Sequence, residues 1–353
     1  MLKNNFEELL IKPPFIRALL EKGYMQPTPI QKKSIPIVLE GNDILGIAQT
    51  GSGKTAAFIL PILQLLNKSQ PKKKNRKVRT LILVPTRELA IQIGENINHY
   101  GKYIAFKKVI IYGGVSQKPQ VHSLNKGVDI IVATPGRVLD LVNQGFCNLN
   151  NIEHFVLDEA DRMLDMGFIK DIKKITNQLP SNRQTLLFTA TMPDTIGKLA
   201  EKLLTNPEHI SIDSESTVIR QLSQFVTFID SNNKKTFLKN LLEDPKFNSV
   251  VVFTRTKHKA DSISNFLQKN GIKADAIHGR KSQNTRIRIL RSFTFSKLRV
   301  LVATDVASRG IDISGITHVI NYEIPNVPED YIHRIGRTAR AGASGTAISL
   351  CSP

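Results

Sequence analysis

A glycine-rich segment, residues 48–55, has the composition of a phosphate-binding loop (P-loop). It follows a short apolar run and opens the helical pattern at 54–66. In that position the glycines let the backbone wrap phosphates, the helix N-terminus presents N–H groups, and Lys54 reaches the β and γ oxygens. Thr55 offers a hydroxyl ligand to magnesium. Ala48 stands where such a loop usually has its first glycine. The expected loop consists of Ala48, Gln49, Thr50, Gly51, Ser52, Gly53, Lys54 and Thr55.

Two adjacent carboxylates follow the apolar run 154–157 further along the chain. Asp158 can hold magnesium directly or through water, and Glu159 can polarise an attacking water molecule. The glycine segment also fits a dinucleotide fingerprint, but that motif needs an acid about 20 residues further on, where this sequence has a run of lysines. The P-loop and the two acids together predict a site for a nucleoside triphosphate with Mg²⁺.

Short apolar runs alternate with helical patterns along the whole chain, which is typical of parallel sheets covered by helices. Apolar density falls around residues 205–223. We therefore expect an α/β protein of two tandem domains, residues 1–210 and 223–353, joined by a linker at 211–222. The expected strands are 43–48, 80–84, 108–112, 129–133, 154–157 and 185–188 in the first half, and 225–229, 249–253, 274–278, 298–303, 318–322 and 346–350 in the second.

The charge balance is strongly basic. The 353 residues include 49 Lys and Arg against 30 Asp and Glu, which gives a formal charge of +19 and a pI near 9.9. Such an excess favours a polyanionic partner, because a basic surface attracts phosphate backbones and releases their counterions. Charge alone does not distinguish RNA, DNA and an anionic membrane. The 41% hydrophobic and 22% charged residues are ordinary for a globular protein.

The two cysteines, Cys147 and Cys351, and the scattered histidines do not form a disulfide framework or a cluster with zinc spacing. The first eight residues lack the basic-then-apolar order of a signal peptide. No apolar run approaches the ~20 residues of a membrane-spanning helix. We therefore expect a reduced, cytoplasmic location and no structural metal.

Residues 158–161 read Asp-Glu-Ala-Asp, the tetrapeptide that names the DEAD-box RNA helicases, and the chain resembles that family over nearly its whole length. Residues 23–31 resemble its Q motif, with Phe6 as the isolated upstream aromatic residue. The resemblance implies two RecA-like domains, and a Gln31 that reads adenine and so favours ATP over GTP. The stretches 158–168 and 326–341 are most similar to the bacterial RhlE-type members.

The resemblance also implies roles for the residues of the remaining motifs. The expected RNA contacts in the first domain are Pro85, Thr86, Arg87, Gly114, Thr134, Pro135, Gly136 and Arg137, and in the second Arg255, Gly279, Gln283, Arg286, Thr304 and Asp305. Gly310 and Asp312 are expected to contact the nucleotide, and Arg337 and Arg340 to act as arginine fingers. The expected coupling residues are Thr189, Ala190, Thr191, Asp161 and His333.

Because these groups are divided between the domains, the resemblance implies a mechanism based on domain closure. An arginine finger contributes roughly 10³–10⁵ in rate, so hydrolysis is expected to be slow until the domains close around ATP and RNA. The two ligands then favour each other's binding. Closure bends one strand of a short duplex and separates a few base pairs. Because the expected contacts are to RNA phosphate and sugar, the affinity for RNA is expected to depend on salt concentration rather than on base sequence.

Three features depart from the family pattern. Thr189 stands where the family has serine, which keeps the hydroxyl and adds a methyl group. Arg280 follows His278-Gly279, where relatives usually carry an acid or an amide. The sequence stops at Pro353, where the family core continues with one more helix, so we expect an uncovered apolar surface and lower stability in the second domain.

Two other functions remain open at this point. An ATP-gated RNA clamp is supported by the altered motif at Thr189, and ATPase activity without strand displacement would identify it. A DNA helicase or translocase could use the same two-domain plan, although the Q motif and residues 158–161 weigh against it. A catalytically inactive binding module is disfavoured because Lys54, Asp158, Glu159 and both candidate fingers are present. We expect a monomer that binds RNA.

Overall fold

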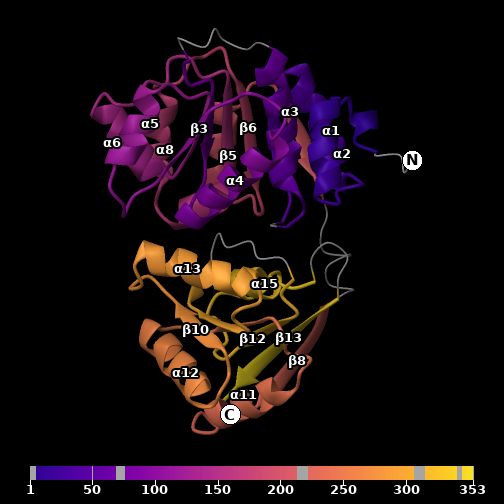
Figure 1. Ribbon diagram of the computed structural model, residues 1–353, viewed down its shortest axis with the longest axis vertical. Helices are drawn as coiled ribbons and strands as arrows, with labels where there is room; N and C mark the ends of the chain where they lie inside the picture. The colour runs from indigo at the N-terminus through magenta and orange to yellow at the C-terminus, as the bar shows by residue number, and fades with distance from the viewer. Residues whose placement is uncertain are drawn as a thin grey trace. The chain divides into compact units, whose positions relative to one another are not determined.

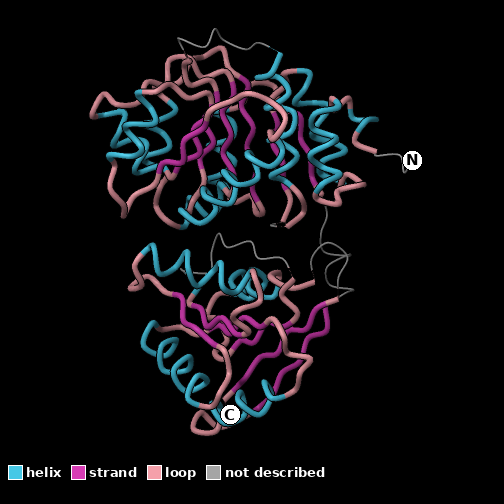
Figure 2. The backbone as a smooth tube through the Cα atoms, viewed as in Figure 1, coloured by secondary structure: helices cyan, strands magenta, loops and turns pink. Residues whose placement is uncertain are grey.

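A computed structural model of the chain describes residues 5–49, 51–68, 76–212, 222–305, 315–339 and 344–352. The chain forms two compact units, Met1–Asp213 and Ser214–Pro353. Each unit is a parallel sheet with helices on both faces (Figures 1 and 2). The units divide within the predicted linker, while the domain limits given above stay predictions.

The first unit contains a seven-stranded sheet in the order β3-β4-β2-β5-β6-β1-β7. Its strands are β1 (Ile44–Ile47), β2 (Thr80–Leu83), β3 (Lys108–Ile111), β4 (Ile130–Ala133), β5 (His154–Asp158), β6 (Gln184–Thr189) and β7 (Glu208–Ser211). Its helices are α1 (Pro13–Glu21), α2 (Pro29–Glu40), α3 (Lys54–Lys68), α4 (Arg87–Tyr100), α5 (Lys118–Asn125), α6 (Pro135–Asn143), α7 (Ala160–Asp165), α8 (Ile169–Thr176) and α9 (Asp194–Leu203), with a short 3-10 turn at Glu7–Leu9.

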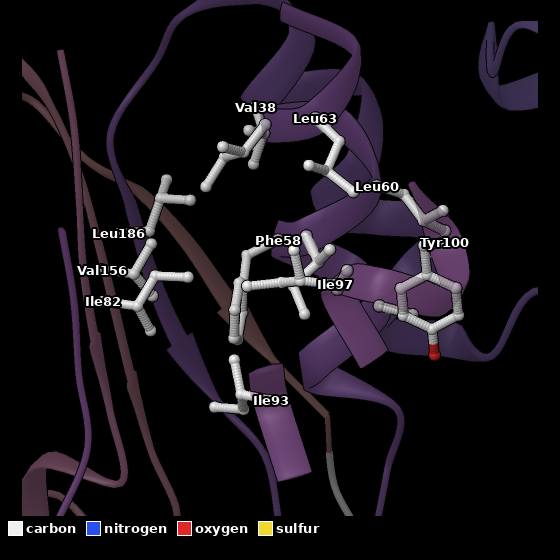
Figure 3. Close-up of a cluster of buried hydrophobic side chains, with 14 of the residues drawn as sticks. Val38, Phe58, Leu60, Leu63, Ile82, Ile93, Ile97, Tyr100, Val156 and Leu186 are labelled. Atoms are coloured by element: carbon white, nitrogen blue, oxygen red, sulfur yellow. The ribbon is translucent and has the colours of Figure 1, made fainter. Parts of the chain in front are cut away.

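Two apolar layers hold this sheet between its helices. One face packs against α1 to α4, and Figure 3 shows Phe58 of α3 and Ile97 of α4 beside the strand residues Ile82 and Val156. The other face packs against α6 to α9 through residues such as Ile172. Apart from β3 and β7 at the two edges, the strands are buried on both faces, which is why their sequences are mainly apolar rather than alternating.

The second unit contains a six-stranded parallel sheet in the order β10-β11-β9-β12-β13-β8. Its strands are β8 (Leu222–Phe228), β9 (Val250–Phe253), β10 (Ala274–Ile277), β11 (Val300–Ala303), β12 (His318–Asn321) and β13 (Gly345–Cys351). Helices α11 (Lys234–Glu243) and α12 (Lys257–Lys269) cover one face. Helix α13 (Gln283–Thr294) packs on the opposite face, where α15 (Pro328–Ile335) also lies (Figure 1).

The predicted α/β fold is confirmed, with a strand at each expected position and ends that differ by up to three residues. Strand β7 was not predicted. It pairs with β1 at the edge of the sheet, in the register Ile44↔Glu208, and only Ile210 among its residues is buried. A single buried side chain leaves no apolar run for sequence analysis to detect. No helix in the described part of the chain is long and apolar enough to cross a bilayer.

Candidate active site

The P-loop region lies at the carboxyl end of β1, where α3 begins at Lys54. Gly51 and Gly53 have φ angles of +87° and +97°, a conformation that glycine adopts without strain. The Lys54 side chain is buried and its Nζ donates to the carbonyl oxygen of Ala48, 2.7 Å away. The lysine therefore lies folded over the loop between the strand and the helix.

Gln31 joins the predicted Q motif to this loop. Its Nε2 donates to the Gly53 carbonyl oxygen at 3.0 Å, and its Oε1 accepts from the backbone N–H of Thr28 at 2.9 Å. Phe6, the expected upstream aromatic, is only 1% exposed and belongs to the apolar core that includes α1 to α4. The structure thus brings Gln31 to the loop and buries Phe6 in the apolar core. Contact of either residue with adenine stays a prediction.

Gly53→Ala is expected to weaken ATP binding about tenfold to a hundredfold. An alanine Cβ at φ +97° would lie 2.5 Å from Gln31 Nε2 and 2.7 Å from Thr28 Oγ1, and a strained backbone position costs about 1–3 kcal/mol. The Kd of a fluorescent ATP analogue measures the effect. Gly197→Ala on α9 is the matched control, because a Cβ there meets nothing within 4 Å. An unchanged Kd for Gly53→Ala would show that the loop does not depend on this conformation.

Asp158 ends β5 and is in register with Phe188 of the neighbouring β6. Burial raises the pKa of Asp158 to about 6, although the Lys54 ammonium group acts in the opposite direction. Its Oδ1 is buried and has no hydrogen-bond partner among the described residues, and the same holds for Ser52 Oγ. A buried carboxylate oxygen without a donor beside a phosphate-binding loop fits a cation ligand. The residues present therefore fit Mg²⁺ bound together with a nucleotide.

Glu159 follows directly and has a left-handed backbone, with φ +58° and ψ +51°. This conformation is unfavourable for a residue with a side chain and persists only where its surroundings enforce it. Arg162 Nη1 lies 3.2 Å from Glu159 Oε2, and both side chains are buried. Sequence analysis did not select Arg162. The available signal was its position three residues after Glu159, a spacing that brings two side chains together at a helix.

Asp161 anchors the segment after β6 that contains three of the predicted coupling residues. Its Oδ2 accepts from the N–H of Ala190 at 3.2 Å, the N–H of Thr191 at 2.9 Å and the Thr191 hydroxyl at 3.0 Å. The Thr189 hydroxyl donates to the Thr191 carbonyl oxygen at 2.7 Å. The structure therefore joins these four residues. His333, the fifth, lies on α15 of the other unit.

A pair of arginines from different motifs converges in the first unit. A Cβ built on Gly113 would lie 3.9 Å from Arg87 Nη2 and 4.0 Å from Arg137 Nη2, so the two guanidinium groups share one place. A side chain at Gly114, whose φ is +79°, would overlap the Arg87 guanidinium. Arg137 also donates from Nη1 and Nη2 to the Val115 carbonyl oxygen, at 3.3 Å. Two neighbouring cations favour an anion such as a backbone phosphate.

The other predicted RNA contacts of this unit lie at helix starts. Thr86 caps α4 and accepts from the N–H of Leu89 at 3.3 Å. Thr134 occupies the corresponding position before α6, which begins with Pro135 and Gly136. Pro85 precedes Thr86 at the carboxyl end of β2. All of them lie at the same sheet edge as Arg87 and Arg137, because parallel strands end together.

In the second unit, Arg255 and Glu323 organise the ends of β9 and β12. Arg255 Nη2 donates to the Ile324 carbonyl oxygen at 2.8 Å, and the Arg255 N–H donates to Glu323 Oε2 at 2.9 Å. Burial would raise the pKa of Glu323, but hydrogen bonds from Lys259, Arg255 and Thr254 outweigh it and lower the pKa to about 2. Sequence analysis missed Glu323, although an acid at the end of an apolar strand was the signal it used for Asp158.

The predicted contacts Gly279, Gln283 and Arg286 lie between β10 and the first turn of α13. Arg280, the departure noted in the sequence, places Nη1 3.1 Å from His258 Nε2. Thr304 follows β11 and is buried. This part of the second unit is therefore rich in cations and helix starts, as the corresponding part of the first unit is.

Asp305 is held by an arginine that sequence analysis did not select. Arg334 Nε and Nη2 donate to its two carboxylate oxygens at 2.6 and 2.7 Å, and Nη1 reaches Asn321 Oδ1 at 3.1 Å. Arg334 is only 2% exposed. Arg337, the predicted finger, is also buried, in the turn after α15. Four predicted site residues lie outside the described residues: Thr50, Gly310, Asp312 and Arg340.

The sheet order sorts these residues into two groups at the edge where the strands end. In the first unit, β3, β4 and β2 lead to the paired arginines and helix starts, whereas β5, β6 and β1 lead to Asp158, the Asp161 network and the P-loop. In the second unit, β10, β11 and β9 lead to the predicted nucleic-acid contacts. Ligand sites of open α/β sheets are found at this carboxyl edge. The arrangement is that of a two-unit P-loop protein with a nucleotide site and a separate cationic region.

Comparison with known proteins identifies the family. The profile of the DEAD/DEAH box helicase family matches residues 28–199, and that of the helicase conserved C-terminal domain matches residues 233–342. The chain is 42% identical to the DEAD-box ATP-dependent RNA helicase CshA of Geobacillus kaustophilus, over 99% of this chain and 73% of that protein. It is 45% identical to CshA of Bacillus cereus, again over 99% of this chain. The chain belongs to the DEAD-box helicase family.

Solved structures agree with this placement. Dbp5 of S. cerevisiae, bound to RNA and ADP BeF3, superposes with a TM-score of 0.87 at 30% identity, over 99% of this chain and 90% of that one. A DEAD box protein from the hyperthermophile Methanococcus jannaschii is 42% identical with a TM-score of 0.58, over 98% and 93%. The chain spans 65% of the length of the Bacillus cereus CshA.

Proposed function

We propose that this protein is an RNA-dependent ATPase that acts as an ATP-dependent RNA helicase and locally separates short RNA duplexes. The observation that carries the proposal is the buried, donor-free oxygen of Asp158 beside the Lys54 loop, on the same sheet edge as the paired Arg87 and Arg137. One unit thus offers both a place for a nucleotide with its cation and a place for a polyanion. Dbp5 has been solved with RNA and ADP BeF3, and its likeness to this chain supports binding of RNA and a nucleotide together here.

We propose that the nucleotide is ATP, bound with Mg²⁺. Ala48, Gln49, Thr50, Gly51, Ser52 and Gly53 supply backbone groups to its phosphates, and Lys54 supplies a charge. Thr55 and Asp158 hold Mg²⁺, which supplies charge neutralisation at the phosphates. Gln31 and Phe6 are assigned to the adenine, and Gly310 and Asp312 to the nucleotide from the second domain. Gln31 is already fixed by hydrogen bonds to Gly53 of the loop and to the Thr28 backbone, so little ordering is needed when a base arrives.

Glu159 is assigned as the residue that orients and deprotonates the attacking water. Its pairing with Arg162, 3.2 Å away, holds the carboxylate in one place. Arg337 and Arg340 are assigned as fingers that stabilise charge developing on the γ-phosphate, a contribution of roughly 10³–10⁵ in rate. Because they belong to the second domain, we infer that the domains close on ATP and RNA before hydrolysis.

The RNA contacts are assigned to the cationic half of each sheet edge. The two domains then bend one strand between them, which an intact duplex does not follow. Contacts to phosphate, sugar and the 2′-hydroxyl would make binding selective for RNA over DNA and largely independent of sequence. The Asp161 network with Thr189, Ala190 and Thr191, together with His333, is assigned to coupling hydrolysis to strand separation. The Thr189 hydroxyl donates to the Thr191 carbonyl oxygen within that segment, a bond that a serine hydroxyl at this position could also make.

The finer assignments rest on the sequence. An RhlE-type subfamily, a monomeric state, a cytoplasmic location and domains at 1–210 and 223–353 are part of this proposal. The subfamily rests on residues 158–168 and 326–341, whereas the curated relatives described above carry the name CshA. The Bacillus cereus relative extends well beyond the length matched here.

ATP hydrolysis at low salt is expected to be stimulated strongly by single-stranded RNA and weakly by DNA of the same sequence. The measurement is steady-state phosphate release without nucleic acid, with RNA and with DNA. Equal stimulation by DNA would favour a DNA helicase or translocase. Stimulated hydrolysis without displacement of a short duplex would favour an ATP-gated RNA clamp. Stimulation by neither nucleic acid would contradict the proposed closure.

A further inference from the structure

The outer face of α13 carries a cationic hollow that the proposed function does not use. Asn284, Ile287, Arg288, Arg291 and Phe295 follow one another at intervals of one, three or four residues and therefore share one side of the helix. They line a hollow of about 430 Å³ together with Ser292 and Lys297. The opposite side of α13 packs on the sheet through Ile289 and Phe293. We call the first side the α13 outer face.

All charged residues in this region are basic. Between residues 280 and 299 there are seven basic residues and no Asp or Glu: Arg280, Lys281, Arg286, Arg288, Arg291, Lys297 and Arg299. Like charges three residues apart destabilise a helix, and α13 has no acid in its first turn to offset its dipole. Among the described residues, no carboxylate lies within ion-pair distance of Arg288 or Lys297. A surface with this excess of positive charge attracts a polyanion.

An exposed aromatic ring stands among these cations. Phe295 is 71% exposed, and its N–H donates to the Arg291 carbonyl oxygen at 2.9 Å, which fixes its backbone at the end of α13. Exposing an apolar ring to water is unfavourable. A ring flanked by cations is the combination that binds single-stranded nucleic acid, because a base stacks on the ring while the adjacent phosphates meet the charges. An anionic membrane would need a larger cluster of apolar groups, and the hollow is lined by only two apolar side chains, Ile287 and Phe295.

The α13 outer face is continuous with the proposed RNA contacts. Gln283 and Arg286 lie in the first turn of the same helix. Phe295 follows Gln283 by 12 residues (295 − 283), which is about 18 Å along a helix. A strand held at the start of α13 therefore needs only a few more nucleotides to reach the ring.

We propose that the α13 outer face is an auxiliary subsite for single-stranded RNA. One base stacks on Phe295, and the flanking phosphates contact Arg288, Arg291 and Lys297. The subsite rests on the proposed function, since it extends an RNA strand already bound by the core. It adds a stacking platform to contacts otherwise made to the backbone, and it favours a strand with an unpaired extension.

The test is the affinity of the whole chain for oligouridine RNAs of increasing length, with a non-hydrolysable ATP analogue present. Affinity is expected to rise in a step once the RNA reaches Phe295. In Phe295→Ala the step disappears, so long RNAs bind about 5- to 100-fold more weakly and short RNAs bind as before. Phe228→Ala is the matched control, because Phe228 is 73% exposed on β8 of the same unit, and it should keep the step.

The charges are tested by salt dependence. For long RNA, replacing Arg288 and Arg291 by glutamine should reduce the slope of log affinity against log salt by about 1.4, since each lost contact to a single strand removes about 0.7. Lys198→Gln with Lys202→Gln, two exposed lysines one turn apart on α9, should leave the slope unchanged. An abasic nucleotide at the position of the step should make Phe295→Ala and the unmodified chain bind equally.

The outcomes separate the subsite from the proposed function. A step that persists in Phe295→Ala, or a loss of affinity for short and long RNAs alike, overturns the subsite while RNA binding by the core stands. If the unmodified chain does not bind RNA of any length tested, the proposed function fails and the subsite fails with it. An equal loss in Phe228→Ala would assign the effect to general damage and also overturn the proposal.

Discussion

Glu159→Gln is expected to lower the RNA-stimulated turnover of ATP by about 10²–10⁴-fold, the contribution of a positioned general base. ATP and RNA affinity should change little, because the substitution keeps the shape of the side chain. The amide oxygen can still accept a hydrogen bond from Arg162, which lies 3.2 Å from the carboxylate. What is lost is the negative charge that takes up a proton from water.

The structure makes this substitution more informative than removal of the side chain. Glu159 has a left-handed backbone and a buried side chain, so Glu159→Ala would leave Arg162 as a buried cation without its partner. That change costs about 3–5 kcal/mol and would mix loss of stability with loss of chemistry. Single-turnover hydrolysis of pre-bound ATP isolates the chemical step in Glu159→Gln.

Glu153→Gln is the matched control for that experiment. Glu153 precedes β5 at the opposite edge of the same strand, where Arg79 Nε and Nη2 donate to its carboxylate oxygens at 2.8 and 2.7 Å. It is thus a second glutamate paired with an arginine, far from the P-loop edge. The RNA-stimulated turnover of Glu153→Gln should match that of the unmodified chain. If Glu159→Gln kept turnover within tenfold of the unmodified chain, Glu159 would not be the general base.

The parts of the fold that sequence analysis predicted are those determined by residues close together in the sequence. Every strand except β7 falls on a short run rich in apolar residues, and the P-loop is a local pattern of glycines, Lys54 and Thr55. A parallel sheet then dictates that the residues after these strands share one edge. For this reason the segments after β1, β5 and β6 could be expected to form one site before their geometry was known.

The unpredicted parts depend on pairs of residues distant in the chain. Arg334 binds Asp305 and Asn321, and nothing in the local sequence of any one of them specifies the others. Glu323 likewise accepts hydrogen bonds from the side chains of Thr254 and Lys259. Such partners follow from the sheet order, which places β9 between β11 and β12, and sequence periodicity does not encode that order. The resemblance supplied motif positions but not these supporting contacts.

The α13 outer face was overlooked for a related reason. Aromatic residues make up only 6% of the chain, yet one exposed ring suffices when a helix aligns it with cations. The spacing of Arg288, Arg291 and Phe295 was visible in the sequence. What the sequence did not show is that Ile289 and Phe293 turn the other side of the helix to the sheet, which leaves this side open.

The second large effect concerns two arginines three residues apart with different expected roles. Arg334 makes a bidentate pair with Asp305 and reaches Asn321 Oδ1 and the Glu323 carbonyl oxygen. Each of these partners belongs to the second unit, so Arg334 holds that unit together. Arg337 is buried in the turn after α15 and is proposed to act on ATP bound by the first unit.

Arg337→Gln is therefore expected to lower RNA-stimulated turnover by about 10³–10⁵-fold, the contribution of an arginine finger. ATP binding in the absence of RNA should be unchanged, because Lys54, Gln31 and Asp158 all lie in the first unit. The measurements are phosphate release with saturating RNA and the Kd of a fluorescent ATP analogue without RNA.

Arg334→Met separates this catalytic effect from a structural one. Removing Arg334 leaves Asp305 without the arginine that pairs with it and should destabilise the second unit by about 3–5 kcal/mol, seen as an earlier unfolding transition in calorimetry. Arg337→Gln should shift that transition much less. At low temperature, where Arg334→Met is still folded, Arg337→Gln should lose far more activity than Arg334→Met does. If instead Arg337→Gln lost stability as Arg334→Met does and kept turnover within tenfold, Arg337 would be a structural residue, and Arg340 alone would remain as the candidate finger.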